Sequence, residues 1–195
     1  MKKYGIFGGT FNPPHIAHSI VADSVREQLQ LDRIIFIPAG NPPLKDSLPG
    51  EHRFEMAKLA FGKDKNFEVS GIEFENLNVK SYTADTLSKL RDKFINDSVK
   101  LFLIIGMDQL KDLPKWKDPE KLFELSEVVV INRPGFKIKD SKPEFSERVV
   151  YADVPFLEIS SSEIREKISC GISVKYFLDR EVHEYILKNG LYLKK

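Results

Sequence analysis

Short apolar runs, each followed by a segment with helical spacing, are the feature of this sequence that most restricts its fold. The runs do not alternate with polar residues, which indicates strands buried on both faces. They are Tyr4–Gly8, Arg33–Pro38, Leu101–Ile105, Val128–Ile131 and a weaker Val149–Tyr151, with a further strand-like stretch over Phe67–Phe74. Such strands, separated by helices, predict an α/β fold: a Rossmann-like doubly wound parallel sheet with helices on both faces. Ligands of such sheets bind beyond the carboxyl ends of the strands.

The helices between these strands are predicted from apolar residues that recur three and four positions apart. We expect helices over Ile16–Leu29, Arg53–Phe61, Thr83–Phe94, Ser161–Ile168 and Arg180–Leu187, with Thr83 as the cap of the third. Proline and glycine residues make Ala39–Gly50 a loop. The length of 195 residues fits one domain, 1–195, with a small C-terminal helical part from about residue 160.

Composition excludes several classes of protein. Lys and Arg number 30 and Asp and Glu 29, so the net charge of +1 argues against a broad nucleic-acid-binding surface. Cys170 is the single cysteine, which excludes an internal disulfide and a zinc site built from several thiolates. The start of the chain lacks the pattern of a signal peptide, and no apolar run reaches the length of a membrane span. We therefore expect a cytoplasmic protein that binds neither nucleic acid nor membrane.

The segment between the first strand and the first helix carries the strongest chemical signal. It reads G-G-T-F-N-P-P-H-I-A-H from Gly8 to His18. Paired glycines allow the backbone to approach a ligand closely, and the start of a helix attracts phosphate. His15 and His18 are three positions apart, so both side chains lie on one face of the helix start. The alternatives are a tight turn with two surface histidines and, more weakly supported, a zinc site.

A second segment, Ile159–Arg165, begins a helix near the C-terminus. Ser160 and Glu163 have the S-x-x-E spacing of a capping box, which on its own would explain the pattern. However, the serine hydroxyls, the helix N–H groups and Arg165 together would also hold a polyphosphate.

These two segments resemble the signatures of the nucleotidyltransferase superfamily, G-G-T-F-[DN]-P-x-H-x-G-H and I-S-S-T-x-I-R. The chain departs from them at Ala17, where the pattern has Gly, and at Ser162, which replaces Thr but keeps the hydroxyl. Further segments narrow the resemblance to bacterial nicotinate-mononucleotide adenylyltransferases: Asn41–Lys45, Ser81–Leu87, Ile105–Leu110, Leu113–Lys117 and Asn132–Gly135. Leu44 departs from the P-P-H-K of that family, whereas Lys45 keeps its place.

The resemblance implies transfer of the adenylyl group of ATP to nicotinate mononucleotide, which gives nicotinate adenine dinucleotide and pyrophosphate in NAD biosynthesis. It implies Mg²⁺ as the cofactor, held mainly by the ATP phosphates and not by protein side chains. The residues that it assigns to catalysis are His15, His18, Lys45 and Arg165. Those for ATP are Gly8, Gly9, Thr10, Phe11, Gly106, Asp108, Ser161 and Ser162. Those for nicotinate mononucleotide are Tyr82, Thr83, Trp116, Lys117 and Arg133.

Several alternatives stay open from the sequence. The closest is another adenylyl- or cytidylyltransferase of the superfamily, such as phosphopantetheine adenylyltransferase. A nucleotide sensor without turnover and an RNA-binding protein are the other classes. Trp116 either packs in the core or stacks on the pyridine ring, and Arg133 is either a surface charge or a contact of the mononucleotide phosphate. Whether the chain forms a homo-oligomer is also open.

Overall fold

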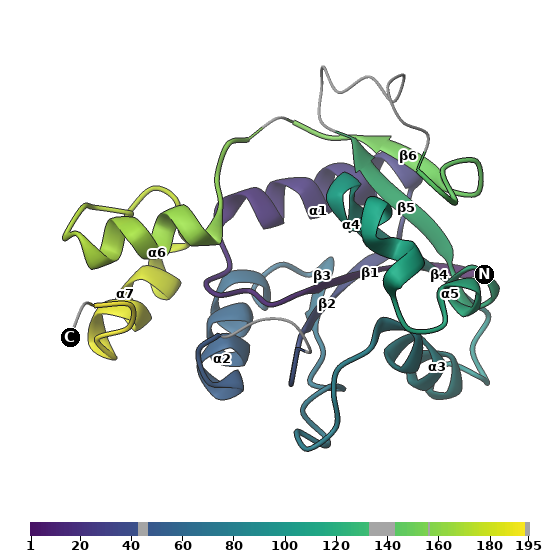
Figure 1. Cartoon of the computed structure of the whole chain (residues 1–195), viewed down its shortest axis with the longest axis horizontal. Helices are drawn as coiled ribbons and strands as arrows, with labels where there is room; N and C mark the ends of the chain where they lie inside the picture. Colours follow the sequence, from purple (N-terminus) through teal and green to yellow (C-terminus); the bar gives the residue numbers. More distant parts are fainter. Residues whose placement is uncertain (43–46, 133–142, 156, 194–195) are drawn as a thin grey trace.

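The computed structural model describes residues 1–42, 47–132, 143–155 and 157–193 (Figure 1). Within these residues, six parallel strands form one sheet in the order β3-β2-β1-β4-β5-β6. They are β1 (Lys2–Gly9), β2 (Arg33–Pro38), β3 (Phe67–Val69), β4 (Val99–Gly106), β5 (Glu127–Asn132) and β6 (Val150–Asp153). The predicted doubly wound parallel sheet is confirmed. The strand predicted over Phe67–Phe74 is shorter, because the Phe74 N–H turns back to the Gly71 carbonyl oxygen, 2.8 Å away.

The helices with clear apolar periodicity form where the sequence predicts them. They are α1 (Ile16–Leu29), α2 (Gly50–Phe61), α3 (Thr83–Lys93), α6 (Ser161–Ser169) and α7 (Arg180–Lys188). Three short elements were not predicted: α4 (Met107–Asp112), the 3-10 helix η1 (Leu113–Lys115) and α5 (Pro119–Leu125). They are too short for a helical period to be visible in the sequence. The prediction that Thr83 caps α3 was wrong, since Tyr82 occupies the cap position and no side chain caps the helix.

Alternate residues of the longer strands face two separate hydrophobic clusters. In β4, Leu101, Leu103 and Ile105 pack in one cluster with residues of α3, α4 and α5. Phe102 and Ile104 pack in the other, with residues of α1 and α2. Full burial of side chains of this size stabilises the fold by about 1.5–3 kcal/mol each. Both faces of the sheet are therefore covered by helices, as expected for strands without polar alternation.

The last two helices belong to a third hydrophobic cluster, at the end of the molecule far from the N-terminus (Figure 1). Ile164 of α6 and Val182 of α7 are buried there against Met56 of α2. The Phe177 carbonyl oxygen also accepts the N–H of Ile16, the first residue of α1, at 3.0 Å. This packing places the start of α6 beside the start of α1.

The sheet order reverses direction at β1. The chain runs outward through β2 and β3 on one side of β1 and through β4, β5 and β6 on the other. The carboxyl ends of β1 and β4 therefore flank the crevice in which doubly wound sheets bind ligands. None of the described helices is both long and apolar enough to cross a membrane.

Candidate active site

His15 and His18 lie together at the start of α1. Their rings stack with centroids 3.7 Å apart and planes inclined by 25°. The His15 backbone N–H donates to Nδ1 of His18 at 3.0 Å. Because Nδ1 accepts this bond, the proton of a neutral His18 is on Nε2, which makes Nε2 a hydrogen-bond donor. The start of the helix thus presents an imidazole N–H of fixed tautomer.

Burial keeps both imidazoles uncharged. It lowers the pKa of His15 to about 4. Burial also lowers the pKa of His18 well below 6.5, and the neighbouring His15 lowers it further. His15 Nδ1 is buried and has no hydrogen-bond partner in the described part of the chain. An anion bound here would favour the charged form and raise both pKa values again, since opposite charges stabilise each other.

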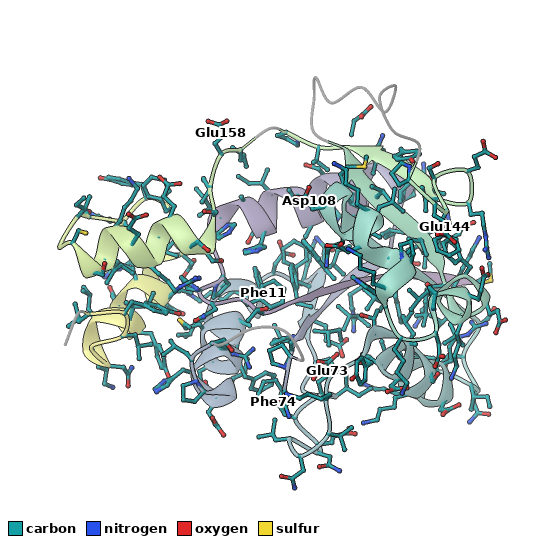
Figure 2. All side chains as sticks on the ribbon, in the orientation of Figure 1. Phe11, Glu73, Phe74, Asp108, Glu144 and Glu158 are labelled. Carbon is teal, nitrogen blue, oxygen red and sulfur yellow. The ribbon has the colours of Figure 1, made fainter. Side chains whose placement is uncertain are left out.

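Phe11 supports His18 from behind. Its ring is 3% exposed and lies edge-on to His18, with centroids 5.1 Å apart, and to Phe61, at 5.4 Å. The ring therefore belongs to the core, in the centre of the molecule (Figure 2). A Cβ on Gly9 would lie 2.9 Å from this ring, so only glycine fits there, whereas a Cβ on Gly8 would meet nothing within 4 Å. Phe11 was predicted to bind ATP; it borders the cavity described below and its ring also contacts His18.

The start of α6 is bonded directly to the loop between β1 and α1. Ser161 Oγ donates to the Pro13 carbonyl oxygen at 2.8 Å. Arg165 donates to the Asn12 carbonyl oxygen at 2.9 Å and to Ser162 Oγ at 3.3 Å. The two sequence signatures therefore lie side by side although about 150 residues separate them.

Two further contacts complete this corner of the site. Ser160 Oγ accepts the Glu163 N–H at 3.1 Å, so the predicted cap of α6 is confirmed. This cap bonds only the N–H group of Glu163, so the N–H groups of Ser161 and Ser162 have no partner inside the helix. Tyr192, near the C-terminus, donates from its hydroxyl to Asn12 Oδ1 at 2.8 Å, and burial raises its pKa.

A cavity of about 530 Å³ opens between these two helix starts. Its wall includes Gly8, Gly9, Thr10, Phe11, His15, Ala17, His18, Gly106, Ser161, Ser162 and Arg165. Asp108, which was predicted to bind ATP, is exposed at the start of α4 and does not border this cavity (Figure 2). Gln109, one residue further, does border it and accepts the Gly106 N–H at 2.9 Å. Sequence reasoning missed Gln109 because a polar residue in a short unpredicted helix carries no pattern of its own.

A second cavity, of about 420 Å³, lies on the other side of the end of β1. Tyr82, Thr83, Trp116 and Lys117 all border it, as expected. Trp116 is only partly buried and packs against the core, and its stacking on a pyridine ring stays a prediction.

The charged groups around the second cavity already have hydrogen-bond partners in the protein. Lys117 Nζ binds both carboxylate oxygens of Asp85, at 2.8 and 3.0 Å, which raises the pKa of Lys117. Glu73, missed by sequence reasoning, borders the same cavity near the centre of Figure 2. Its carboxylate accepts from Thr86 Oγ1 at 2.6 Å and from the Gly40 N–H at 3.2 Å.

The two cavities share a wall. Gly8, Gly9, Thr10 and Gln109 border both of them. Ligands in the two cavities would therefore approach each other at the carboxyl end of β1, next to the histidine pair. Lys45 and Arg133, two further predicted site residues, lie outside the described residues. No group of three or more His, Cys, Asp and Glu side chains that could hold a metal ion occurs among the residues that the structure describes.

The chain is similar in sequence and in fold to several known proteins. A family model described as cytidylyltransferase-like matches residues 6–167. The chain is 40% identical over 195 residues to the nicotinate-nucleotide adenylyltransferase of Bacillus subtilis, covering 98% of this chain and 99% of that protein. It is 41% identical over 191 residues to a probable nicotinate-nucleotide adenylyltransferase of Thermus thermophilus, covering 97% and 99%. The fold matches that of Plasmodium falciparum nicotinic acid mononucleotide adenylyltransferase complexed with NaAD, with a TM-score of 0.79, 21% identity and 98% coverage of both chains.

Proposed function

This chain belongs to the cytidylyltransferase-like family and, within it, to the nicotinate-nucleotide adenylyltransferases, and from this we propose that it joins ATP and nicotinate mononucleotide. The products are nicotinate adenine dinucleotide and pyrophosphate. The observation that carries the proposal is the pair of cavities that meet at Gly8–Thr10 beside His18. The first cavity takes ATP and the second takes the mononucleotide. Both substrates are intracellular nucleotides, so we expect the enzyme to act in the cytoplasm.

The reaction needs no general base. The mononucleotide phosphate is already ionised at neutral pH, since its second pKa is about 6. One of its oxygens attacks the α-phosphorus of ATP in line, and the bond from that phosphorus to the bridging oxygen of pyrophosphate breaks. The obstacle is the mutual repulsion of two polyanions. Catalysis therefore consists of positioning and of charge stabilisation.

The groups around the first cavity suit this task. We assign His18 Nε2–H and the His15 imidazole to the ATP phosphates, with Arg165 and the first N–H groups of α6 on the opposite side. Lys45 is assigned to the same phosphates on the family resemblance alone. Mg²⁺, held mainly by the ATP phosphates and not by protein side chains, would offset the negative charge of the triphosphate.

The second cavity suits a pyridine mononucleotide. Trp116 offers a ring face for stacking on an electron-poor ring. The first N–H groups of α3, beginning at Thr83, have no partner within the helix and favour a carboxylate. We assign the recognition of the nicotinate carboxylate to these N–H groups, since Lys117 is occupied by Asp85. Arg133 is assigned to the mononucleotide phosphate by family resemblance.

We treat residues 1–195 as one catalytic domain. Support comes from the hydrogen bonds that join Ser161 and Arg165 to the loop at Asn12 and Pro13. Without the C-terminal helices, the first cavity would lack one of its sides.

The test is a pyrophosphate-release assay with ATP and one of three acceptors: nicotinate mononucleotide, nicotinamide mononucleotide or phosphopantetheine. We expect release with the nicotinate compound at a kcat/KM far above that of the other two. Turnover with phosphopantetheine instead would show that the enzyme uses a different class of acceptor. If the folded protein releases no pyrophosphate with any of the three acceptors, the chain binds nucleotides without catalysing this reaction.

A further inference from the structure

Arg53, in α2, is a buried cation that holds together the main chain of three separate segments. Its side chain is 1% exposed. Nε donates to the Leu48 carbonyl oxygen at 2.9 Å, and Nη2 donates to that of Gly40 at 3.1 Å. Nη1 donates to the carbonyl oxygens of Thr10, at 3.0 Å, and Ala39, at 2.5 Å. The guanidinium group thus binds the loop after β1, the loop after β2 and the segment before α2.

Burying the charge of Arg53 costs free energy, which would not be expected if the residue only filled space. Burial lowers the pKa of Arg53, although a guanidinium group stays protonated in proteins. In the described part of the chain it forms no salt bridge within 4.0 Å: four carbonyl oxygens accept its hydrogen bonds, and the carboxylates of Glu73 and Glu51 favour its charge from farther away. An apolar side chain of similar volume would usually fill such a site at lower cost. Instead, the planar guanidinium group of Arg53 holds several N–H donors at fixed angles, and these donors match the positions of the carbonyl oxygens around it.

Two of the segments that Arg53 joins, the loops after β1 and β2, border the cavities. Thr10 borders both of them, and Ala39 borders the second. The Ala39 N–H donates to the Gly9 carbonyl oxygen at 2.9 Å, which ties the same two loops a second time.

The loop after β2 is fixed on its other side as well. The Gly40 N–H donates to Glu73 Oε2 at 3.2 Å, and Asn41 and Ser81 exchange two hydrogen bonds, both 3.0 Å long. A Cβ at Gly40 would lie 2.2 Å from the Glu73 carbonyl oxygen, so the loop has no room to shift toward it. Arg53 and the bond from the Ala39 N–H to Gly9 then link this fixed loop to the wall that the cavities share, and Arg53 is the side chain among these links.

We infer that Arg53 is a positioning residue, which sets the spacing between the ATP cavity and the mononucleotide cavity. The inference rests on the proposed function for the identity of the two ligands. Arg53 itself borders neither cavity. Each substrate alone should bind normally without Arg53, because its binding does not depend on the distance between the two cavities. The reaction does depend on that distance, and so does the binding of any ligand that spans both cavities.

The experiment compares Arg53→Met, Arg53→Lys and a control, Met56→Ala. Met fills the buried volume but makes no hydrogen bond, whereas Lys reaches fewer carbonyls than Arg. Met56 is equally buried in α2 but lies in the third hydrophobic cluster, against which the Leu48 side chain also packs. Met56→Ala therefore lowers stability while Arg53 keeps all of its hydrogen-bonding groups. Thermal unfolding, kcat, both KM values and calorimetric affinities for ATP, nicotinate mononucleotide and nicotinate adenine dinucleotide are measured for each protein.

We expect Arg53→Met to lower kcat by about 100-fold, because a misplacement of about 1 Å has that effect. Its affinity for the dinucleotide should fall by at least about tenfold, while the two mononucleotides lose less than about threefold, since only a linked ligand depends on the span between sites. Arg53→Lys should lie between Met and the native enzyme. Met56→Ala should melt at a lower temperature and keep its kcat.

The inference is overturned if Arg53→Met keeps its kcat and its affinity for the dinucleotide, or if all three ligands weaken equally. If Arg53→Met does not fold, Arg53→Lys is used in its place. The criterion is again whether affinity for the dinucleotide falls more than affinity for each separate substrate. The binding measurements also separate the two claims. A native enzyme that binds the dinucleotide but does not turn over nicotinate mononucleotide would refute the proposed function and leave the test of Arg53 intact.

Discussion

At the scale of single residues, the hydrogen bond from the His15 N–H to His18 Nδ1 decides what the site can do. This hydrogen bond occupies Nδ1 of His18 as an acceptor. The ring proton of neutral His18 is therefore on Nε2, and Nε2 can donate a hydrogen bond. Burial keeps the ring neutral until an anion arrives. A donor of this kind does not attract solvent anions as a permanent charge would.

His18→Ala should lower kcat by about 100- to 1,000-fold, the usual effect of removing one donor to developing charge. The melting temperature should change little, since the partly buried ring makes few bonds beyond the site. Steady-state kinetics and thermal unfolding measure the two effects. His52→Ala is the matched control, because His52 bonds Tyr185 at 2.9 Å and borders neither cavity. Near-native turnover in folded His18→Ala protein would remove His18 from catalysis.

The neutral state of His15 predicts a loss of stability in acid. Its folded pKa of about 4 lies below the ordinary histidine value of 6.5, so between these two pH values the unfolded chain binds a proton that the folded protein does not. The protein keeps its full stability above the unfolded-state pKa of 6.5. As the pH falls toward the folded-state pKa of about 4, the free energy of unfolding drops by on the order of 3 kcal/mol. His15→Asn cannot titrate, so its unfolding free energy should fall less steeply over this range. Parallel curves in denaturant titrations of the two proteins would contradict this.

At the scale of elements, α6 is the helix that turns two distant loops into one site. Its first residues bond to Asn12 and Pro13, and its Arg165 points to the same loop. The helix therefore contributes both a wall and a cation to the first cavity.

Arg165→Ala should raise the KM for ATP by about 10- to 100-fold, as expected for hydrogen bonds to a charged group. The KM for nicotinate mononucleotide should stay close to its native value, because Arg165 borders only the first cavity. Lys167→Ala is the control on the same helix, since Lys167 pairs with Glu163 at 3.3 Å and borders neither cavity. Equal losses for both substrates would show that Arg165 acts through the fold.

The sequence predicted the long elements well and the short ones poorly, for a physical reason. A buried strand such as β4 is recognisable from its own residues, and α1 was predicted with its observed bounds. Elements of one or two turns, such as α4, η1 and α5, are stabilised by the packing of Leu110, Leu113 and Leu122 on the sheet. That packing depends on residues far away in the chain.

The segment after η1 carries Trp116, the single tryptophan, at the edge of the second cavity. Nicotinate mononucleotide should quench its fluorescence, whereas ATP alone should do so much less. Trp116→Ala should raise the KM for the mononucleotide more than that for ATP, because a stacking surface is lost. Trp116→Phe, which keeps a ring, should recover part of the affinity. Selectivity against nicotinamide should change little, since stacking does not read the carboxylate.

At the scale of the whole molecule, the candidate site is built from residues that only the complete fold brings together. The histidine pair and the α6 serines could be predicted because each belongs to a local pattern. Arg53, Glu73 and Gln109 could not, because their roles depend on loops packed from other parts of the chain. The C-terminal Tyr192 is a similar case, since it bonds Asn12 across 180 positions of sequence.

The wall between the two cavities has a consequence for drug resistance. Gly8 and Gly9 both belong to it, and a Cβ on Gly9 would lie 2.9 Å from the Phe11 ring, so a side chain there requires this buried ring to move. An inhibitor that hydrogen-bonds to peptide groups there has few side chains whose mutation would exclude it. Under selection with such a compound, we expect escape mutations at Gln109 or in regulation of the gene's expression, and none at Gly9. A shared wall that offers backbone groups to a bound compound leaves few positions at which a substitution could exclude that compound.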